Sequence, residues 1–246
     1  MLKKTAAFGS LLTVLCASST LAHGPNFKSG FLAGAHVGYS FGSGKFNNTL
    51  TQTNPGVVAL LVNPASTVSS SASKSGPLFG VFGGYRQLFN QNYTLGVILE
   101  ANILGSNEFS KQATHTFTTV GGVVVPLSVT NRMKRTFNVI PSVSVGKVFC
   151  DRYHVSLGLG VAIARFKQQV TFPVASRGSA QTKIGIVPSI GVEYAATKNV
   201  SIVGNFSYEI YKKINKIYND LPGGIVYASS VKPRYATLKI GAAYRF

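Results

Sequence analysis

Charged residues are scarce in this sequence, and acidic residues are the scarcest of all. Lys, Arg, Asp and Glu make up 12% of the 246 residues, and Asp and Glu together number only 6. An ordinary soluble domain carries about 25% charged residues, so the composition argues against a soluble enzyme. Tryptophan is absent, and the 2 cysteines are too few for a disulfide scaffold.

The sequence also lacks a long hydrophobic run after its N-terminal segment. A membrane-spanning helix needs about 20 consecutive apolar residues, and none follows residue 22. The first 22 residues combine a basic start at Lys3 and Lys4, an apolar core, and small residues leading to Ala22. That order is typical of a secretory signal peptide. We predict that residues 1–22 are cleaved and that residues 23–246 form one exported domain.

Positive charge is abundant by comparison. Without Lys3 and Lys4 the chain keeps 22 Lys and Arg against 6 Asp and Glu, a net charge of +16. Such an excess often indicates nucleic-acid binding, but export removes the protein from that partner. We therefore expect no nucleic-acid partner and look for an anionic one outside the cytoplasm.

Apolar residues alternate with small or polar residues along most of the chain. The clearest strip consists of Phe31, Ala33, Ala35, Val37, Tyr39 and Phe41. A period of two indicates a strand with two unlike faces. Eight such strips begin near residues 31, 79, 93, 137, 153, 184, 200 and 238. Many begin or end with Tyr or Phe, as lipid-facing strands do at the membrane boundary.

The connections between the strips alternate in length. Short turns are expected at residues 89–92, 149–152 and 195–199, and long extracellular loops at 42–77, 105–135, 167–183 and 212–233. This alternation predicts an all-β fold, an eight-stranded antiparallel up-and-down transmembrane β-barrel. Pro141 and Pro188 cannot donate to a central ladder, so we expect a bulge at each.

One stretch leaves the strand count open. Residues 114–129 read as a hairpin about Gly121 and Gly122. Val123, Val125, Leu127 and Val129 would supply one lipid face, but the opposing half offers a poor one. We predict a hairpin that projects above the membrane, with a ten-stranded barrel as the alternative.

The last residues and the first hairpin carry a family resemblance. The ending YATLKIGAAYRF, with Tyr244 and Phe246, resembles the C-terminal assembly signal of bacterial outer-membrane barrels. GAHVGYSFG at 34–42 and GVFGGYRQ at 80–87 resemble the first hairpin of the small barrels. Over residues 28–246 the chain resembles the OmpA-type transmembrane domain and the opacity and surface-antigen porin-like family. The resemblance implies residence in the bacterial outer membrane, and partnership with its lipid and its assembly machinery.

The charges on inward faces form the first candidate site. An eight-stranded barrel is just wide enough for side chains to fill it, and buried charges must be paired. The inward charges predicted to form an interior network are Arg86, Glu100, Glu193, Glu209, Lys239 and Arg245. They are either structural filling, which we expect, or the gate of a narrow diffusion pore.

External cations form the second candidate site. Those just above the lipid faces are expected to contact the phosphates of lipopolysaccharide by Coulomb attraction: Arg132, Lys134, Arg135, Arg165, Lys167, Lys183, Lys212 and Lys213. Residues 43–75 are rich in Ser, Thr, Asn and Gly, and are expected to form a mobile loop.

No catalytic constellation, metal-ligand spacing or phosphate loop is present in the sequence, so we expect neither an enzyme nor a cofactor. The predicted role is structural, surface-exposed and porin-like. The alternatives are a gated pore and an adhesin or surface antigen whose basic loops meet host surface molecules.

Overall fold

The computed structural model describes residues 27–52, 65–90, 92–105, 108–118, 123–173, 176–221 and 225–246. The predicted signal peptide, residues 1–22, lies outside the described residues. Within them the regular elements are the strands β1 (Gly30–Gln52), β2 (Ala65–Phe89), β3 (Tyr93–Leu104), β4 (Glu108–Thr118), β5 (Val124–Phe149), β6 (Tyr153–Thr171), β7 (Ser176–Ala195), β8 (Val200–Tyr211), β9 (Ile214–Leu221) and β10 (Ile225–Arg245). No helix in this part of the chain is long and apolar enough to cross a bilayer.

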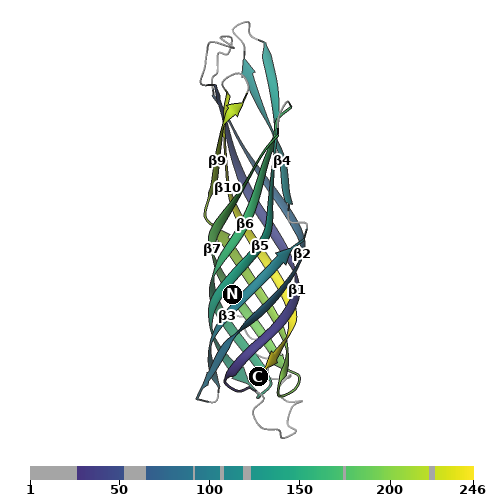
Figure 1. The fold of residues 1–246 in the computed structure, drawn as a ribbon, viewed down its shortest axis with the longest axis vertical. Coiled ribbons are helices and arrows are strands. Elements are labelled where there is room, and N and C mark those ends of the chain that lie inside the picture. The colour runs from purple at the N-terminus through teal and green to yellow at the C-terminus, as the bar shows by residue number, and fades with distance from the viewer. Residues whose placement is uncertain are drawn as a thin grey trace, which may run out of the picture.

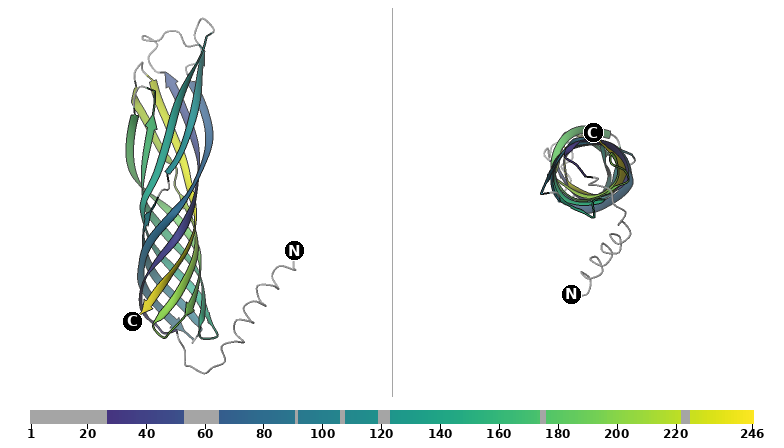
Figure 2. Two further views of the ribbon diagram at one scale, coloured as in Figure 1. Left: turned by 90° about the vertical axis from the view of Figure 1, so that its right-hand side faces the viewer. Right: turned by 90° about the horizontal axis from the view of Figure 1, so that it is seen from below.

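Eight of the strands close into a ring. The hydrogen-bonded order is β1-β2-β3-β5-β6-β7-β8-β10, and β10 pairs back with β1 from Leu32↔Arg245 to Gln52↔Ile225. The end-on view in Figure 2 shows the ring closed on itself. A closed sheet leaves no unpaired edge in lipid, and the predicted eight-stranded antiparallel barrel is confirmed.

The other two strands continue the wall above β3 and β8, because they pair with the next stretches of β5 and β10. β4 pairs with β5 from Glu108↔Lys134 to Thr118↔Val124, which confirms the predicted hairpin. β9 pairs with the first residues of β10. The sequence missed β9, because residues 212–233 were predicted to be a loop. The sheet therefore has ten strands: eight close the ring, and β4 and β9 take the places of β3 and β8 in the wall of the stalk.

The predicted long loops are largely strand. Figure 1 shows an elongated tube, and six of the ring strands are 19 to 26 residues long, whereas about 9–11 residues cross a membrane. β1 and β2 stay paired as far as Thr51↔Ala65. The prediction of a mobile loop at 43–75 was therefore wrong for residues 43–52 and 65–75, because inward-facing Phe46 and Leu50 are fully buried and hold β1 in the wall.

We call the part of the tube beyond the lipid-facing strips the stalk. It comprises residues 43–52, 65–75, 108–118, 124–135, 165–172, 176–183, 211–221 and 225–235. The opposite end of the tube carries the tight turns, where the backbone N–H of Asn92 donates to Phe89 and that of Arg152 donates to Phe149. The predicted short turns are confirmed there.

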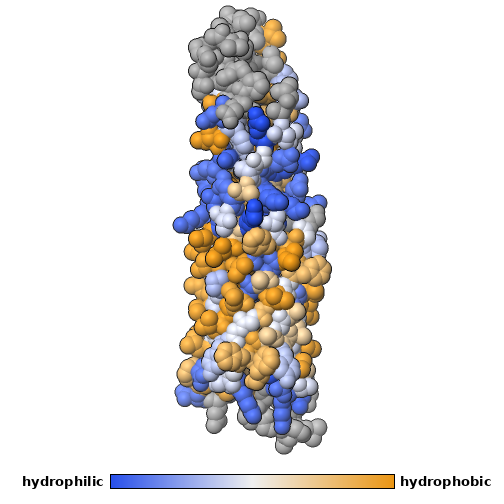
Figure 3. Space-filling view, in the orientation of Figure 1, coloured by the Kyte–Doolittle hydropathy of each residue, from blue (hydrophilic) through white to orange (hydrophobic). Residues whose placement is uncertain are grey.

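The outer surface changes character along the tube. Figure 3 shows an apolar band across the lower half of the visible face and a hydrophilic surface above it. The band is made by the outward strips, whose members remain exposed, for example Phe41, Val97 and Ile240. Exposed apolar side chains on this scale require a lipid environment, because soluble proteins rarely expose large apolar patches.

The prolines do not produce the predicted bulges. Around Pro141 the β5–β6 pairs Val139↔Ile163 and Ser142↔Gly160 keep one register. Around Pro188 the β7–β8 pairs Ile186↔Ile210 and Ser189↔Ser207 do the same. Each proline omits ladder pairing on one side but inserts no extra residue. A bulge does occur in β5, between Arg135 and Phe137.

Candidate functional site

The lumen at the end with the tight turns is filled by charges gathered around one carboxylate. Glu193 Oε2 lies 2.7 Å from Arg86 Nη1 and 3.7 Å from His154 Nδ1, and Glu193 Oε1 lies 3.8 Å from Arg245 Nε. Phe27, three residues before β1, is buried against this layer, with its ring centroid 4.4 Å from the guanidinium carbon of Arg245. Arg86, Glu193 and Arg245 were predicted from the sequence to belong to the interior network, but no pattern in the sequence indicated Phe27.

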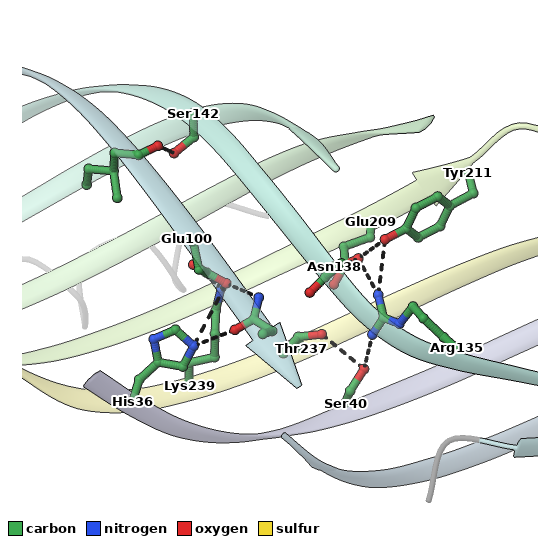
Figure 4. Close-up of polar contacts among 12 residues, drawn as sticks. His36, Ser40, Glu100, Arg135, Asn138, Ser142, Glu209, Tyr211, Thr237 and Lys239 are labelled. Carbon is green, nitrogen blue, oxygen red and sulfur yellow. Dashed lines mark hydrogen bonds and ion pairs between the residues drawn. The ribbon is translucent and has the colours of Figure 1, made fainter. Parts of the chain in front are cut away.

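A second ion pair crosses the middle of the lumen. Lys239 Nζ donates to both carboxylate oxygens of Glu100, at 2.7 and 2.8 Å. Asn102 Nδ2 donates to Glu100 Oε1 at 2.6 Å, and His36 Nε2 lies 2.7 Å from Asn102 Oδ1. In Figure 4, His36, Glu100 and Lys239 converge from β1, β3 and β10. A buried pair of this kind needs such extra hydrogen bonds to offset its desolvation.

A small polar cavity lies beside this pair. Its volume is about 70 Å³, and its walls include Glu100, Lys239, Asn205 and the serines at 142, 144, 156, 189 and 207. Hydroxyl groups on several sides give water two to four partners, so the cavity can hold a few water molecules. It is too small to serve as a continuous channel.

The third layer contains a residue that the sequence placed wrongly. Arg135 was predicted to contact lipopolysaccharide from the rim, but its side chain is fully buried in the lumen. It forms an ion pair with Glu209, donates to Ser40 Oγ at 3.1 Å and to Tyr211 Oη at 3.2 Å, and lies 3.6 Å from the ring centroid of Tyr235. Figure 4 shows the Arg135, Glu209, Tyr211 and Ser40 contacts.

The bulge in β5 explains that error. Side chains alternate between the two faces of a strand, and one extra residue moves all that precede it to the other face. Phe137 and Val139 face lipid, so strict alternation would also point Arg135 outward. With the extra residue at Thr136, positions 129, 131, 133 and 135 face the interior instead. The lipid face that the ten-stranded alternative required at Leu127 and Val129 is absent for the same reason, since Val129 is fully buried.

Above Arg135 the interior becomes apolar. A cluster of large side chains fills the lower stalk: Phe46, Phe109, Met133, Phe166, Tyr211, Ile214, Val231 and Tyr235. A second cluster fills the upper stalk: Leu50, Val129, Val170, Phe172, Tyr218 and Tyr227. Between them, Ser229 Oγ donates to Asn48 Oδ1 at 2.9 Å and Asn131 Nδ2 donates to Tyr227 Oη at 2.8 Å. We call these layers together the stalk plug.

The remaining predicted lipopolysaccharide contacts lie outside the lumen. Arg132, Arg165, Lys167, Lys212 and Lys213 are exposed, whereas Lys134 and Lys183 are half-buried. Arg132, Lys134 and Lys167 line one hollow of about 460 Å³ together with Glu108. Lys213 lines another, of about 630 Å³, with Lys45, Lys232 and Arg234.

The two aromatic residues of the C-terminal motif lie on the outer surface. Tyr244 and Phe246 are exposed, and their ring centroids lie 5.0 Å apart. The backbone N–H of Phe246 donates to Phe31 at 3.0 Å, which ties the end of the chain to β1. Their role in assembly stays a prediction.

Three solved structures are similar to this fold at low sequence identity. The outer membrane protease OmpT from Escherichia coli is 10% identical, with a TM-score of 0.51 and coverage of 93% of this chain and 100% of that one. OprG from Pseudomonas aeruginosa is 13% identical (TM-score 0.46; 89% and 97% covered), and Ail from Yersinia pestis is 12% identical (TM-score 0.40; 89% and 100% covered). At these identities the likeness to OmpT shows a shared fold and nothing of its protease activity. No curated protein matches the chain in sequence.

A family model described as the outer membrane protein beta-barrel domain matches residues 8–246. The match spans every strand of the closed ring and of the stalk, and it agrees with the apolar band that faces lipid. The chain therefore belongs to the outer membrane β-barrel family and is located in the bacterial outer membrane.

Proposed function

We propose that this protein is a non-conducting barrel with a structural, surface-exposed role, and that it acts through the outer wall of its stalk. The observation that carries the proposal is the filled lumen. Three layers of paired charges cross the barrel within or at the edge of the apolar band, and the stalk plug continues above them.

The stalk plug is a stronger barrier to ions than the charge layers are. An ion pair can separate and let water pass, but large buried aromatic side chains leave no polar path and exclude water by packing. Phe46, Phe109 and Phe166 come from β1, β4 and β6, so the cluster is built across the lumen rather than along one wall. Opening it would require several strands of the stalk to separate.

The outer wall supplies the interaction surface. Arg132, Arg165, Lys167 and Lys213 are exposed just above the apolar band. Cations at that level attract anionic headgroups by about 1 kcal/mol each. We propose that these side chains hold lipopolysaccharide phosphates around the stalk, which would anchor the tube upright in the outer leaflet.

The proposal includes no catalytic step. In the described part of the chain, no group of three His, Cys, Asp or Glu side chains is placed to hold a metal ion. His36 and His154 lie near carboxylates inside the lumen. His115, in the stalk, is fully buried, and its Nδ1 lies 3.3 Å from Ser66 Oγ.

Single-channel recording in a planar bilayer tests the filled lumen. We expect no discrete conductance steps from refolded mature protein whose insertion is confirmed by the gel-mobility difference between unheated and heated samples. Glu100→Gln removes the charge that Lys239 pairs with, and we expect it to lower stability without producing steps. Reproducible steps from the wild type, or conductance raised by Glu100→Gln at unchanged stability, would contradict the proposal and favour the gated pore.

Lipopolysaccharide binding tests the outer wall separately. We expect binding to detergent-solubilised protein to weaken as ionic strength rises, because exposed charges are screened. If lipopolysaccharide does not bind, or if its binding does not respond to salt, the proposed role of the exposed cations is wrong. The proposal of a non-conducting lumen would still stand.

A further inference from the structure

One of the two basic hollows on the stalk has no acidic residue in its walls. Lys45 of β1 and Lys232 of β10 are direct cross-strand partners, and Arg234 follows two residues later on the same outward face of β10. Lys213, on the connection from β8 to β9, completes the group. All four side chains are exposed, and they surround a hollow of about 630 Å³.

The rest of the hollow is small and polar. Its walls are completed by Ser43, Gly44, Asn47, Ser71, Ala72 and Ser73, which come from β1 and β2. Hydroxyl and amide groups can donate to an anion, and short side chains leave it room to approach. The hollow therefore combines four positive charges with several neutral donors.

Like charges placed directly opposite each other across two strands are destabilising. In this hollow no acidic partner relieves the repulsion: in the described part of the chain, no carboxylate lies within 4 Å of Lys45, Lys232 or Arg234. Glu100, Glu193 and Glu209 form ion pairs inside the lumen. An arrangement that costs stability in the empty protein points to an anion that binds from outside.

The height of the cluster indicates where that anion comes from. Tyr39 and Phe41 end the lipid-facing strip of β1, and Ser43 and Lys45 are the next two outward residues. A strand rises about 3.4 Å per residue and tilts by about 40° in such barrels. Lys45 and its neighbours therefore lie about 5 to 10 Å above the aromatic boundary, at the level of lipid headgroups.

The second hollow differs in one respect that makes it a matched control. It contains Arg132, Lys134 and Lys167, but Glu108 lies 3.9 Å from Arg132 and neutralises part of the charge. The two hollows share their position on the stalk and their polar walls. They differ in whether the protein supplies its own anion.

We propose that Lys45, Lys213, Lys232 and Arg234 form a binding site for a ligand that carries two or more phosphate groups. A diphosphorylated lipid headgroup of the outer leaflet and a free polyphosphate share this chemistry. Four cations of two kinds suit such a ligand, since lysine binds phosphate as a point charge and arginine can bind it through two parallel hydrogen bonds. The proposal rests on the proposed function only in taking the stalk wall as the interaction surface.

The test compares two double variants that each remove two positive charges. Lys45→Gln/Lys232→Gln alters the proposed site, and Lys134→Gln/Lys167→Gln alters the other hollow. Mature protein in zwitterionic detergent is titrated with diphosphoryl lipid A in mixed micelles and, separately, with inositol hexakisphosphate. We expect the first variant to bind about 30-fold more weakly than the wild type. The second removes one cation of the proposed wall, Lys167, from a hollow that Glu108 partly neutralises, so we expect it to weaken binding by only about fivefold.

The two titrations distinguish the sources of phosphate. Loss confined to lipid A assigns the site to a lipid headgroup, and loss confined to inositol hexakisphosphate assigns it to a soluble polyphosphate. If both variants lose affinity equally, the site is not localised and this inference fails, while the broader basic wall stands. If neither variant changes binding, both the site and the wall are wrong.

Thermal unfolding without ligand supplies a second readout. Lys45→Gln/Lys232→Gln removes an unrelieved repulsion between exposed side chains, so we expect its melting temperature to be equal to or above that of the wild type. Added polyphosphate should raise the melting temperature of the wild type and leave that of this variant nearly unchanged. A variant that melts well below the wild type without ligand would show that the lysines are structural and would overturn the inference.

Discussion

The ion pair between Arg135 and Glu209 offers the sharpest test of the lumen as described. Arg135 is fully buried and Glu209 nearly so, and both make further hydrogen bonds, to Ser40 and Tyr211. Replacing Arg135 by Met keeps most of the side-chain volume but leaves Glu209 without its counter-charge. Breaking a buried pair in this way costs about 3–5 kcal/mol.

A double-mutant cycle separates the pair from its surroundings. Arg135→Met/Glu209→Gln removes both charges, and replacing a whole buried pair is often close to neutral. We therefore expect the double variant to be more stable than Arg135→Met alone, by about 2 kcal/mol or more. Such a gain on adding a second mutation is the mark of two residues in direct contact.

Urea unfolding in detergent micelles measures these differences. Because the chain contains no tryptophan, the transition is followed by far-UV circular dichroism rather than by intrinsic tryptophan fluorescence. With a slope of about 2 kcal/mol per molar urea, the midpoint of Arg135→Met should fall by about 2 M. Arg132→Met, three residues earlier on the outer face, is the control and should change the free energy of unfolding by less than about 0.5 kcal/mol.

A larger loss of stability from Arg132→Met than from Arg135→Met would refute the reasoning. Arg135 would then lie on the outer face and Arg132 in the lumen, as strict alternation along β5 predicts, and the bulge at Thr136 would be absent. A large loss in both the single and the double variant would place Arg135 inside but would deny that Glu209 is its partner.

Three further predictions concern other parts of the chain. Burial lowers the pKa of His115 below its ordinary value of 6.5, so the unfolded chain binds the proton more readily. Stability should therefore fall as the pH drops below about 6.5, and His115→Asn should reduce that slope in urea midpoints measured from pH 7.5 to 5. Phe27→Ala should lower the free energy of unfolding by about 3 kcal/mol, while the exposed Phe31 replaced by Ala should cost less in the same urea assay. Phe246→Ser should slow folding into proteoliposomes that contain the assembly machinery but barely change the urea midpoint of the folded barrel, because Phe246 is 76% exposed; an unchanged rate would remove its role as a signal.

The ring could be predicted from sequence because lipid imposes a simple rule on its outer face. Every residue that faces hydrocarbon must be apolar, so alternation is visible in strips such as 31–41 and 153–163. The interior follows by elimination, which is why Glu100, Glu193 and Glu209 were placed in the lumen correctly. The tight turns followed from the intervals between strips.

The stalk could not be predicted in the same way, because its apolar residues face the lumen and its polar residues face outward. Met133 faces inward and Phe137 faces lipid, yet both are apolar and occupy odd positions. Apolar residues stay at odd positions on both sides of the bulge, but the odd positions face lipid after it and the lumen before it. The sequence therefore gives no sign of the bulge. β9 was missed because its residues do not alternate by polarity: Lys216 lies between the buried Ile214 and Tyr218 on the inward face, and Ile217 is exposed on the outward face.

This reversal gives a physical reason for the closed lumen. Within the membrane the wall gains stability from lipid on its outer face, and its interior can be polar, as it is around Glu100. In the stalk the outer face meets water and carries residues such as Lys45 and Lys232. Its stability must then come from apolar burial inside, as in a soluble protein. Phe46, Phe109 and Tyr235 supply that burial, and the change occurs directly above Arg135.

The wall of this barrel is one sheet thick and extends far beyond the lipid. We therefore expect that an open lumen would make the stalk unstable. An aqueous channel would expose both faces of the stalk strands to water and leave only the backbone ladder to hold them. The apolar side chains of Leu50, Val129 and Val170 show that the interior is used as a core along the stalk. We therefore propose that the same burial that keeps the stalk folded also blocks the passage of ions, so that this chain does not combine conduction with an ordered stalk.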